Sequence, residues 1–196
     1  MNGPVHTMIG LSTGIAGATL LSDKLPVITE SPLGPSCFVI AIVSGSVFPD
    51  LDLPGRPLGF LGHRRLTHTL LFPAIAVVIM IMLKGTHIPE LASIVRALLF
   101  GWIWGYVLHI IADLFQKRGV PLFWPVIPAN VHLANMPVKY DKICLIIYLI
   151  ILCYVCVTFG NLSYNILDFL KTSPSILIAV VIAIIEIKKS LFKSMR

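Results

Sequence analysis

The sequence carries very little charge. Only 12% of its 196 residues are Asp, Glu, Lys or Arg, about half of the roughly 25% found in soluble domains. Acidic residues are the scarcer kind, with 9 against 15 basic ones. Because 57% of the chain is hydrophobic, there are too few polar side chains to cover a soluble surface. The composition therefore argues against a soluble globular protein.

Other residue patterns are also missing. The basic residues do not form a strip with interleaved aromatics, so we expect no nucleic-acid binding. The N-terminal run lacks the charged start of a signal peptide, since its first basic residue is Lys24. Cysteine occurs four times. Cys153 and Cys156 have C-x-x-C spacing but lie inside an apolar run without a second pair, so we expect no zinc or redox site there and no disulfides.

Long apolar runs are what the sequence has in abundance. The mean hydropathy is +0.91, and nearly continuous runs lie at Thr69–Leu83, Ala97–Ile111, Ile143–Phe159 and Ile176–Ile187. Inside a bilayer every backbone polar group needs a partner within the protein, which favours helices. We predict an all-α, polytopic transmembrane bundle with about four to six membrane-embedded helices. It forms one domain over residues 1–196, with the C-terminal helices and a basic tail at 143–196.

The runs follow one another with short connections. In chain order we expect a helix over Met1–Leu21, a loop over Ser22–Pro35, apolar runs over Ser36–Phe48, Thr69–Leu83 and Leu91–Phe115, and a polar connection over Gln116–Lys142. The first helix has Gly10, Gly14 and Ala18 four residues apart, a spacing that lets another helix approach closely in lipid. The first two runs are shorter than the ~20 apolar residues of a full span. They form short tilted spans, a re-entrant pair or a partly embedded hairpin.

Ionisable residues stand at the ends of these runs and all reach one side of the membrane. They are His6, Asp50, Asp52, His63, His68, His109 and Asp113. Whether the first two runs cross the membrane or form a hairpin, the chain is on the same side of the membrane before the first run and after the second. That side also holds eleven of the fifteen Lys and Arg residues, including the C-terminal tail. The positive-inside bias therefore predicts that this side and the C-terminus face the cytoplasm.

The residue types on this side are those of a metal site. His109 and Asp113 are four residues apart, so they lie one turn apart on one helix face. Imidazole and carboxylate ligands suit a divalent cation, with zinc favoured here over manganese or iron. The further candidate ligands are His6, Asp50, His63 and His68. These candidates exceed the number of ligands that one zinc needs. One interpretation is therefore a site with two or more metals, which could hold the attacking and the leaving oxygen of a phosphoester.

Neighbouring polar residues have catalytic interpretations. Asp50 or Asp52 would serve as a ligand or as a general base. Arg64 and Arg65, between two of the histidines, would clamp a phosphate in bidentate fashion. An alternative of equal weight is that these arginines anchor a cytoplasmic loop to anionic headgroups. Thr67 would orient an imidazole or cap the following helix.

The order and spacing of these motifs resemble a known family. His6, Pro49-Asp-x-Asp52, His63-Arg-Arg-x-Thr-His68, His109-x-x-x-Asp113 and Gly119-Val-x-Leu-Phe-Trp-Pro125 look like the YdjM-like family of bacterial inner-membrane, metal-dependent hydrolases. The resemblance runs from residue 3 to about residue 137 and implies a membrane-embedded helical hydrolase with a poorly defined substrate. More remotely, the chain is similar to the zinc-dependent phospholipase C and P1 nuclease group. That similarity implies His109 and Asp113 as metal ligands, joined by others from the set above.

The function that we expect is a membrane-bound, metal-dependent hydrolase working at the cytoplasmic face on a phosphoester such as a phospholipid, with membrane lipids as its surroundings. Two alternatives remain open. One is a non-enzymatic membrane protein that binds or transports metal ions, and the other is a membrane scaffold with a structural metal. On the opposite side of the membrane we identify His87, Glu90 and Asp168, and no comparable group of histidines. Because an ion pathway needs polar groups at successive depths, this favours a surface site over a pore.

Overall fold

The computed structural model describes residues 3–20, 24–52, 66–83 and 89–134, and six positions between 143 and 150. Every regular element within these residues is a helix, and the backbone bridge between Val120 and Val131 is an isolated one. The helical class is therefore confirmed. The predicted run Ile143–Phe159 lies mostly, and the run Ile176–Ile187 entirely, outside the described residues.

The elements follow the predicted runs closely. They are α1 (Gly3–Leu20), α2 (Pro26–Thr29), α3 (Gly34–Val47), η2 (Phe48–Asp52), η4 (Leu66–His68), α4 (Leu71–Met82) and α5 (Pro89–Leu114). The segment expected to be a loop, Ser22–Pro35, contains the one-turn helix α2. This helix begins at Pro26, whose fixed φ angle suits the first position of a helix and whose missing N–H costs nothing there.

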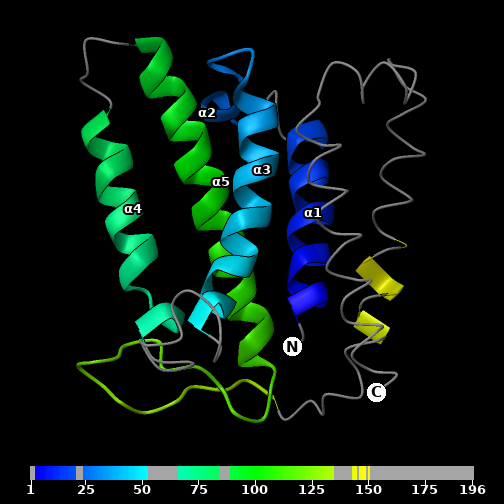
Figure 1. Ribbon diagram of the computed structural model, residues 1–196, viewed down its shortest axis with the longest axis vertical. Coiled ribbons are helices and arrows are strands. Elements are labelled where there is room, and N and C mark those ends of the chain that lie inside the picture. Colours follow the sequence, from blue (N-terminus) through cyan, green and yellow to red (C-terminus); the bar gives the residue numbers. More distant parts are fainter. Residues whose placement is uncertain are drawn as a thin grey trace.

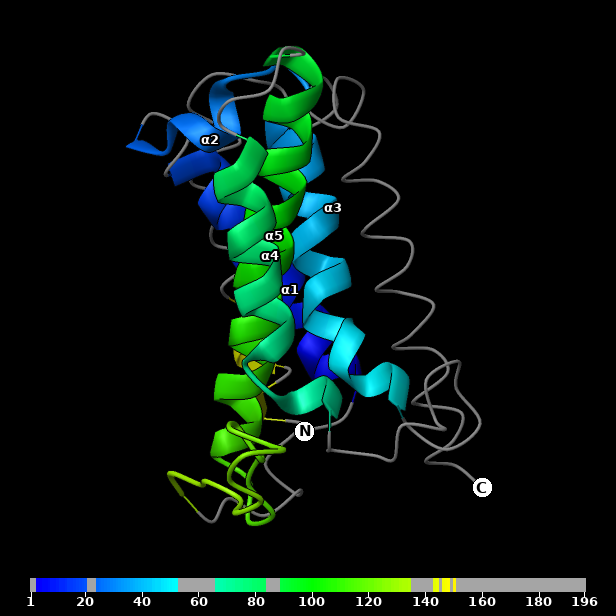
Figure 2. The same cartoon turned by 90° about the vertical axis from the view of Figure 1, so that its left-hand side faces the viewer.

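Helices α3 and α5 form the centre of the bundle. Helix α3 packs along α5 and α1, and α4 packs on α5 (Figures 1 and 2). The chain runs alternately along the bundle. As a result, the start of α1, the end of α3, the start of α4 and the end of α5 lie at the same end of the molecule, the lower end in Figure 1. This end also contains η2 and η4.

Glycines allow the helices to come close. A methyl group on Gly105 of α5 would collide with the carbonyl oxygen of Ile42 in α3. On α1, a methyl group on Gly10 would collide with the Ser46 hydroxyl, and one on Gly14 with the side chain of Ile42. The close helix approach predicted from the spacing of Gly10 and Gly14 is therefore confirmed.

The outer surface of the bundle is apolar. Two helical segments are long and apolar enough to cross a membrane, namely residues 34–52 and α5, while α4 is a shorter apolar helix. On α4, Val78, Ile81 and Met82 are 55%, 57% and 74% exposed. Such a continuous apolar face is unfavourable in water but is the normal surface of a helix in lipid.

The connection after α5 folds back against the bundle end. The N–H of Leu133 donates to the carbonyl of Leu114 at the end of α5 (2.7 Å), and the N–H of Leu70 donates to the carbonyl of Leu122 (3.1 Å). Val120 is fully buried and packs with Leu114. These contacts hold residues 116–134 close to η4 and to the last turn of α5.

Candidate metal centre

Six of the ionisable residues identified in the sequence meet at this end of the bundle. They are His6 of α1, Asp50 and Asp52 of η2, His68 of η4, and His109 and Asp113 of α5. We call them the His/Asp cluster. All six are buried, and the most exposed, Asp50, is only 5% exposed. Burial of so many ionisable groups is costly unless they are paired or bind an ion.

Local features of the chain bring η2 to the cluster. Pro49 lies two residues after Val47, the last residue of α3, and cannot donate the backbone hydrogen bond that would continue the α-helix. The chain therefore turns into the short 3-10 helix η2, which contacts both α5 and η4. This places Asp50 and Asp52 beside the last turns of α5, where His109 and Asp113 lie.

The Asp113 carboxylate is the centre of the cluster. Its Oδ1 lies 3.3 Å from Nε2 of His6, and its Oδ2 lies 3.6 Å from Nε2 of His68 and 3.8 Å from Nε2 of His109. The rings of His6 and His109 are stacked with centroids 3.7 Å apart. Asp50 completes the arrangement, with its Oδ1 3.9 Å from Nε2 of His109.

Two overlapping groups within the cluster have the geometry of a cation site. One is His6, His109 and Asp113, and the other is Asp50, His68 and His109. In each group the three possible ligand atoms lie within 4.8 Å of one another. Ligand atoms around a tetrahedral zinc are roughly 3.3–3.5 Å apart at bond lengths of about 2.0–2.1 Å. Only small side-chain movements separate the observed arrangement from such a site.

Unsatisfied nitrogens support the fit to a cation. Nδ1 of His6 and Nε2 of His109 are buried and have no hydrogen-bond partner among the residues that the structure describes. A buried polar atom left in this state costs about 1–3 kcal/mol, whereas a metal ion would satisfy a ring nitrogen directly. The donor set, imidazole with carboxylate, is one that divalent transition metals accept. The residues present therefore fit a divalent metal, and they do not indicate which one.

A second set of contacts orients the imidazoles. Nδ1 of His109 lies 2.7 Å from the carbonyl oxygen of Ser46, which requires a proton on Nδ1 and leaves the lone pair of Nε2 facing the cluster. Nδ1 of His68 lies 3.4 Å from Oδ2 of Asp52, and the Thr67 hydroxyl donates to the same oxygen. Carboxylate or carbonyl partners at the second ring nitrogen are typical of metal-binding histidines.

Tyr106 is a site residue that the sequence analysis missed. It is fully buried, and its hydroxyl lies 2.5 Å from the carbonyl oxygen of Thr67 and 2.9 Å from that of Thr69. These carbonyls flank His68, so Tyr106 fastens η4 to α5 on both sides of that histidine. One signal was available in the sequence: Tyr106 precedes His109 by three residues and therefore shares its face of the helix.

The environment of His68 favours its protonated form. Burial lowers the pKa of the imidazole, but the carboxylates of Asp113 and Asp52 raise it by more, so that the pKa lies above its usual value. A proton held between these carboxylates partly compensates their charge. A metal ion that binds to His68 would have to displace this proton, because only the neutral imidazole is a ligand.

Three of the predicted residues lie outside the described residues, namely His63, Arg64 and Arg65. Their assignment as a metal ligand and as phosphate-binding groups stays a prediction. Asp52 belongs to the cluster but lies behind His68 rather than in either group of three possible ligands. Its role as a ligand or general base likewise stays a prediction.

The fold and the cluster together define a class: a helical membrane protein with a buried His/Asp cluster, suited to a divalent metal, at one end of its bundle. More particularly, the chain belongs to the YdjM inner membrane protein family, whose model matches residues 1–190. The YdjM family predicted from the motifs is therefore confirmed, without the hydrolase activity that the resemblance implied, and the family description names an inner membrane protein.

Individual relatives cover a smaller part of the chain. The chain is 36% identical over 93 residues to the inner membrane protein YdjM of Escherichia coli (strain K12), and equally so to that of Shigella flexneri. These matches cover 40% of this chain and 44% of each relative. The names of the relatives give a location and no activity. No solved structure matches the chain.

Proposed function

We propose that the protein is a membrane-bound, metal-dependent hydrolase that acts on a phosphoester, such as a phospholipid, at the cytoplasmic face of the inner membrane. The observation that carries this proposal is the convergence of three imidazole Nε2 atoms on the Asp113 carboxylate, at 3.3–3.8 Å. The cluster lies where the helices end, which is where a headgroup or another polar substrate would be within reach.

The ligands would come from both groups described above. His6, His109 and Asp113 would hold one cation, which we expect to be zinc rather than manganese or iron. Asp50 and His68 would complete its coordination or hold a second ion. Such a metal lowers the pKa of a bound water toward neutrality. The carbonyl of Ser46 and the carboxylate of Asp52 would keep the imidazoles of His109 and His68 oriented toward it.

In the arrangement that leaves Asp50 off the metal, proton transfer would fall to this residue. Of the six cluster residues it is the most exposed, at 5%, and it is the one at the edge of the group, 3.9 Å from Nε2 of His109. A carboxylate in that position can accept a proton from an attacking water. Arg64 and Arg65, which directly precede η4 in the sequence, would bind the phosphate.

The wider architecture belongs to the same proposal. It consists of four to six membrane-embedded helices with the His/Asp cluster and the C-terminus in the cytoplasm. The basic residues support this orientation, because eleven of the fifteen lie in segments on the side of the cluster.

A second candidate is a structural metal in a protein without enzymatic activity. One observation favours it: the cluster residues are between 0% and 5% exposed, and structural sites are closed whereas catalytic sites keep an open position. A metal-transporting protein fits less well. Beyond the cluster, the buried polar side chains of α1 are hydroxyls, such as that of Ser12, which donates to the carbonyl of Met8 within its own helix.

Elemental analysis of the detergent-purified protein tests the proposal, with a His109→Ala, Asp113→Ala double variant beside it. We expect stoichiometric zinc or manganese in the parent and at least a tenfold loss in the double variant, with helix content preserved in circular dichroism. His132→Ala, which changes an exposed histidine of the connection, should keep the metal.

Turnover assays then separate the candidates. Hydrolysis of phosphodiester or phospholipid substrates by the metal-loaded parent supports the hydrolase. Stoichiometric metal without turnover of either kind would identify the structural-metal candidate. A parent that stays metal-free after supplementation would refute both.

A further inference from the structure

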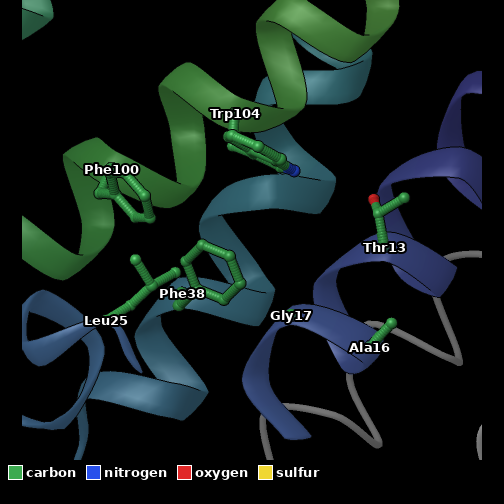
Figure 3. A pocket seen from close by; sticks show the side chains of 7 residues that line it. All are labelled: Thr13, Ala16, Gly17, Leu25, Phe38, Phe100 and Trp104. Carbon is green, nitrogen blue, oxygen red and sulfur yellow. The ribbon is translucent and has the colours of Figure 1, made fainter. Parts of the chain in front are cut away.

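A pocket lies deeper in the bundle, away from the His/Asp cluster. It has a volume of about 270 Å³ and is formed by α1, α3, α5 and the residue before α2 (Figure 3). Helix α1 contributes Thr13 and Ala16 to its wall, α3 contributes Phe38, and α5 contributes Phe100 and Trp104. Two of these helices, α1 and α5, also carry His6, His109 and Asp113 of the cluster.

The lining of the pocket is suited to hydrocarbon. None of its seven lining residues is charged. The hydroxyl of Thr13 already donates to the carbonyl of Ile9 at 2.5 Å, so it is not available as a donor to a ligand. The aromatic rings of Phe38, Phe100 and Trp104 supply much of the wall. Burial of an apolar group in such a space is favourable, whereas a polar group would find few partners besides the indole N–H of Trp104.

The pocket is continuous with the interface between the protein and the bilayer. Trp104 forms part of its wall and is 46% exposed on α5, one of the two segments long enough to span the membrane. In a membrane, lipid chains surround this surface. An acyl chain is therefore the apolar ligand that is available to the pocket. A methylene group occupies about as much space as a water molecule, about 30 Å³. The pocket therefore has room for a segment of one acyl chain.

The depth of the pocket matches a lipid whose headgroup reaches the cluster. Trp104 and Phe100 precede His109 on α5, and Thr13 follows His6 on α1. At 1.5 Å per helical residue these separations are roughly 7, 14 and 10 Å along the bundle. One leaflet of a bilayer contributes about 15 Å of hydrocarbon. The pocket thus lies at the depth of an acyl chain whose phosphate is at the cluster end.

We propose that this pocket binds one acyl chain of a membrane phospholipid whose phosphate reaches the His/Asp cluster. The inference rests on the proposed hydrolase function and names its substrate class. It follows from the apolar wall between α1, α3 and α5, from the exposure of Trp104 toward lipid, and from the distance of both from the metal ligands.

Photocrosslinking tests the binding step. The full-length protein is placed in nanodiscs that contain phosphatidylglycerol with a diazirine in the middle of one acyl chain, and the crosslinked peptides are identified by mass spectrometry. We expect crosslinks to the α1 and α5 segments that line the pocket. Ala16→Phe fills the pocket and should lower their yield at least fivefold. Val78→Phe adds the same group on the exposed face of α4 and should leave the yield as in the parent.

Turnover tests the link to the site. Hydrolysis of dioleoyl phosphatidylglycerol is compared with that of a small soluble phosphodiester, bis(4-nitrophenyl) phosphate, in the zinc-loaded protein. In Ala16→Phe the ratio of lipid to soluble turnover should fall at least fivefold through a higher KM for the lipid, and Val78→Phe should keep the parent ratio. If Ala16→Phe does not insert into membranes, the smaller Ala16→Leu takes its place.

The outcomes are distinct. A parent without crosslinks in the pocket, or a yield that Ala16→Phe leaves intact, overturns the proposal. So does an unchanged turnover ratio, which would make the bound lipid a structural one. Failure of the hydrolase function itself appears elsewhere, as a metal-free parent or as no hydrolysis of the soluble phosphodiester, neither of which depends on the pocket.

Discussion

At the scale of single residues, the cluster consists of imidazoles and the groups that hold them. Asp113 faces Nε2 of three histidines, whereas Asp52 and the carbonyl of Ser46 face the Nδ1 atoms of His68 and His109. The two aspartates therefore differ in role despite the same chemistry. Under the proposed function Asp113 would be a ligand and Asp52 an orienting group, and partners of the second kind typically change metal affinity by about 10–100-fold.

This difference predicts unequal effects of two matched substitutions. Asp52→Asn keeps the size of the side chain and an oxygen for the Thr67 hydroxyl but removes the charge behind His68, so zinc affinity should fall about tenfold. Asp113→Asn should lose stoichiometric zinc. Titration against a competing chelator, with circular dichroism as a check on folding, measures both. Equal loss in the two variants would place Asp52 among the ligands.

Tyr106 provides a second test at this scale. Tyr106→Phe removes the hydroxyl that is shared by the carbonyls of Thr67 and Thr69. We expect a stability loss of about 1–3 kcal/mol, because both buried carbonyls lose a donor, and a zinc affinity that is roughly tenfold weaker, because His68 is less firmly held. Thermal unfolding with and without zinc provides the measurement. A variant with lower stability but parental zinc affinity would limit Tyr106 to a packing role.

At the scale of elements, the contact between α3 and α5 sets the distances in the cluster. It is made at glycines: Gly105 lies against Ile42, and Gly45 lies against the backbone of Trp102. The carbonyl of Ser46, which orients His109, belongs to the same contact. Any separation of these two helices therefore also moves Asp50 away from His109.

Gly105→Ala tests this contact, because a close contact and an open one predict opposite changes in stability. In a helix without neighbours alanine is more favourable than glycine by about 1 kcal/mol. Here the added methyl group collides with the Ile42 carbonyl, so we expect destabilisation by about 1–3 kcal/mol instead and reduced zinc content. Ala74→Leu, at an exposed position of α4, should change neither. A more stable Gly105→Ala protein would show that the helices are not in close contact.

At the scale of the whole molecule, orientation in the membrane decides which compartment the cluster meets. By sequence, eleven of the fifteen Lys and Arg residues fall in segments that we predict on the side of the cluster, and the positive-inside bias favours the cytoplasm for such segments. The long polar connection after α5 folds over the same end of the bundle. The cluster, this connection and the basic tail should therefore share one compartment.

Reporter fusions test the orientation. A fluorescent protein fused after Arg196 should fluoresce and alkaline phosphatase fused there should be inactive, because the latter requires the periplasm. Fusions truncated after Leu83, at the other end of the bundle, should give the opposite pattern. Active phosphatase at the C-terminus would place the cluster in the periplasm.

The sequence by itself determined the helical class and the boundaries of the main helices. Apolar runs at this density have only one way to satisfy their backbone in a membrane, and Pro and Gly residues separate them clearly. The alternation of these runs also determined that His6, Asp50, His68 and His109 reach one end of the bundle. That residues more than a hundred positions apart lie at the same end of the bundle was thus predictable from the number of apolar runs between them.

Tertiary structure decided the arrangement within that end. The position of Asp113 among three imidazoles, the place of Asp52 behind His68 and the role of Tyr106 depend on distances between side chains of different helices. Those distances follow from how closely α3 and α5 pack and how the chain turns at Pro49, and sequence spacing encodes neither. The apolar pocket was invisible for the same reason: its residues belong to separate helices and share no pattern along the chain.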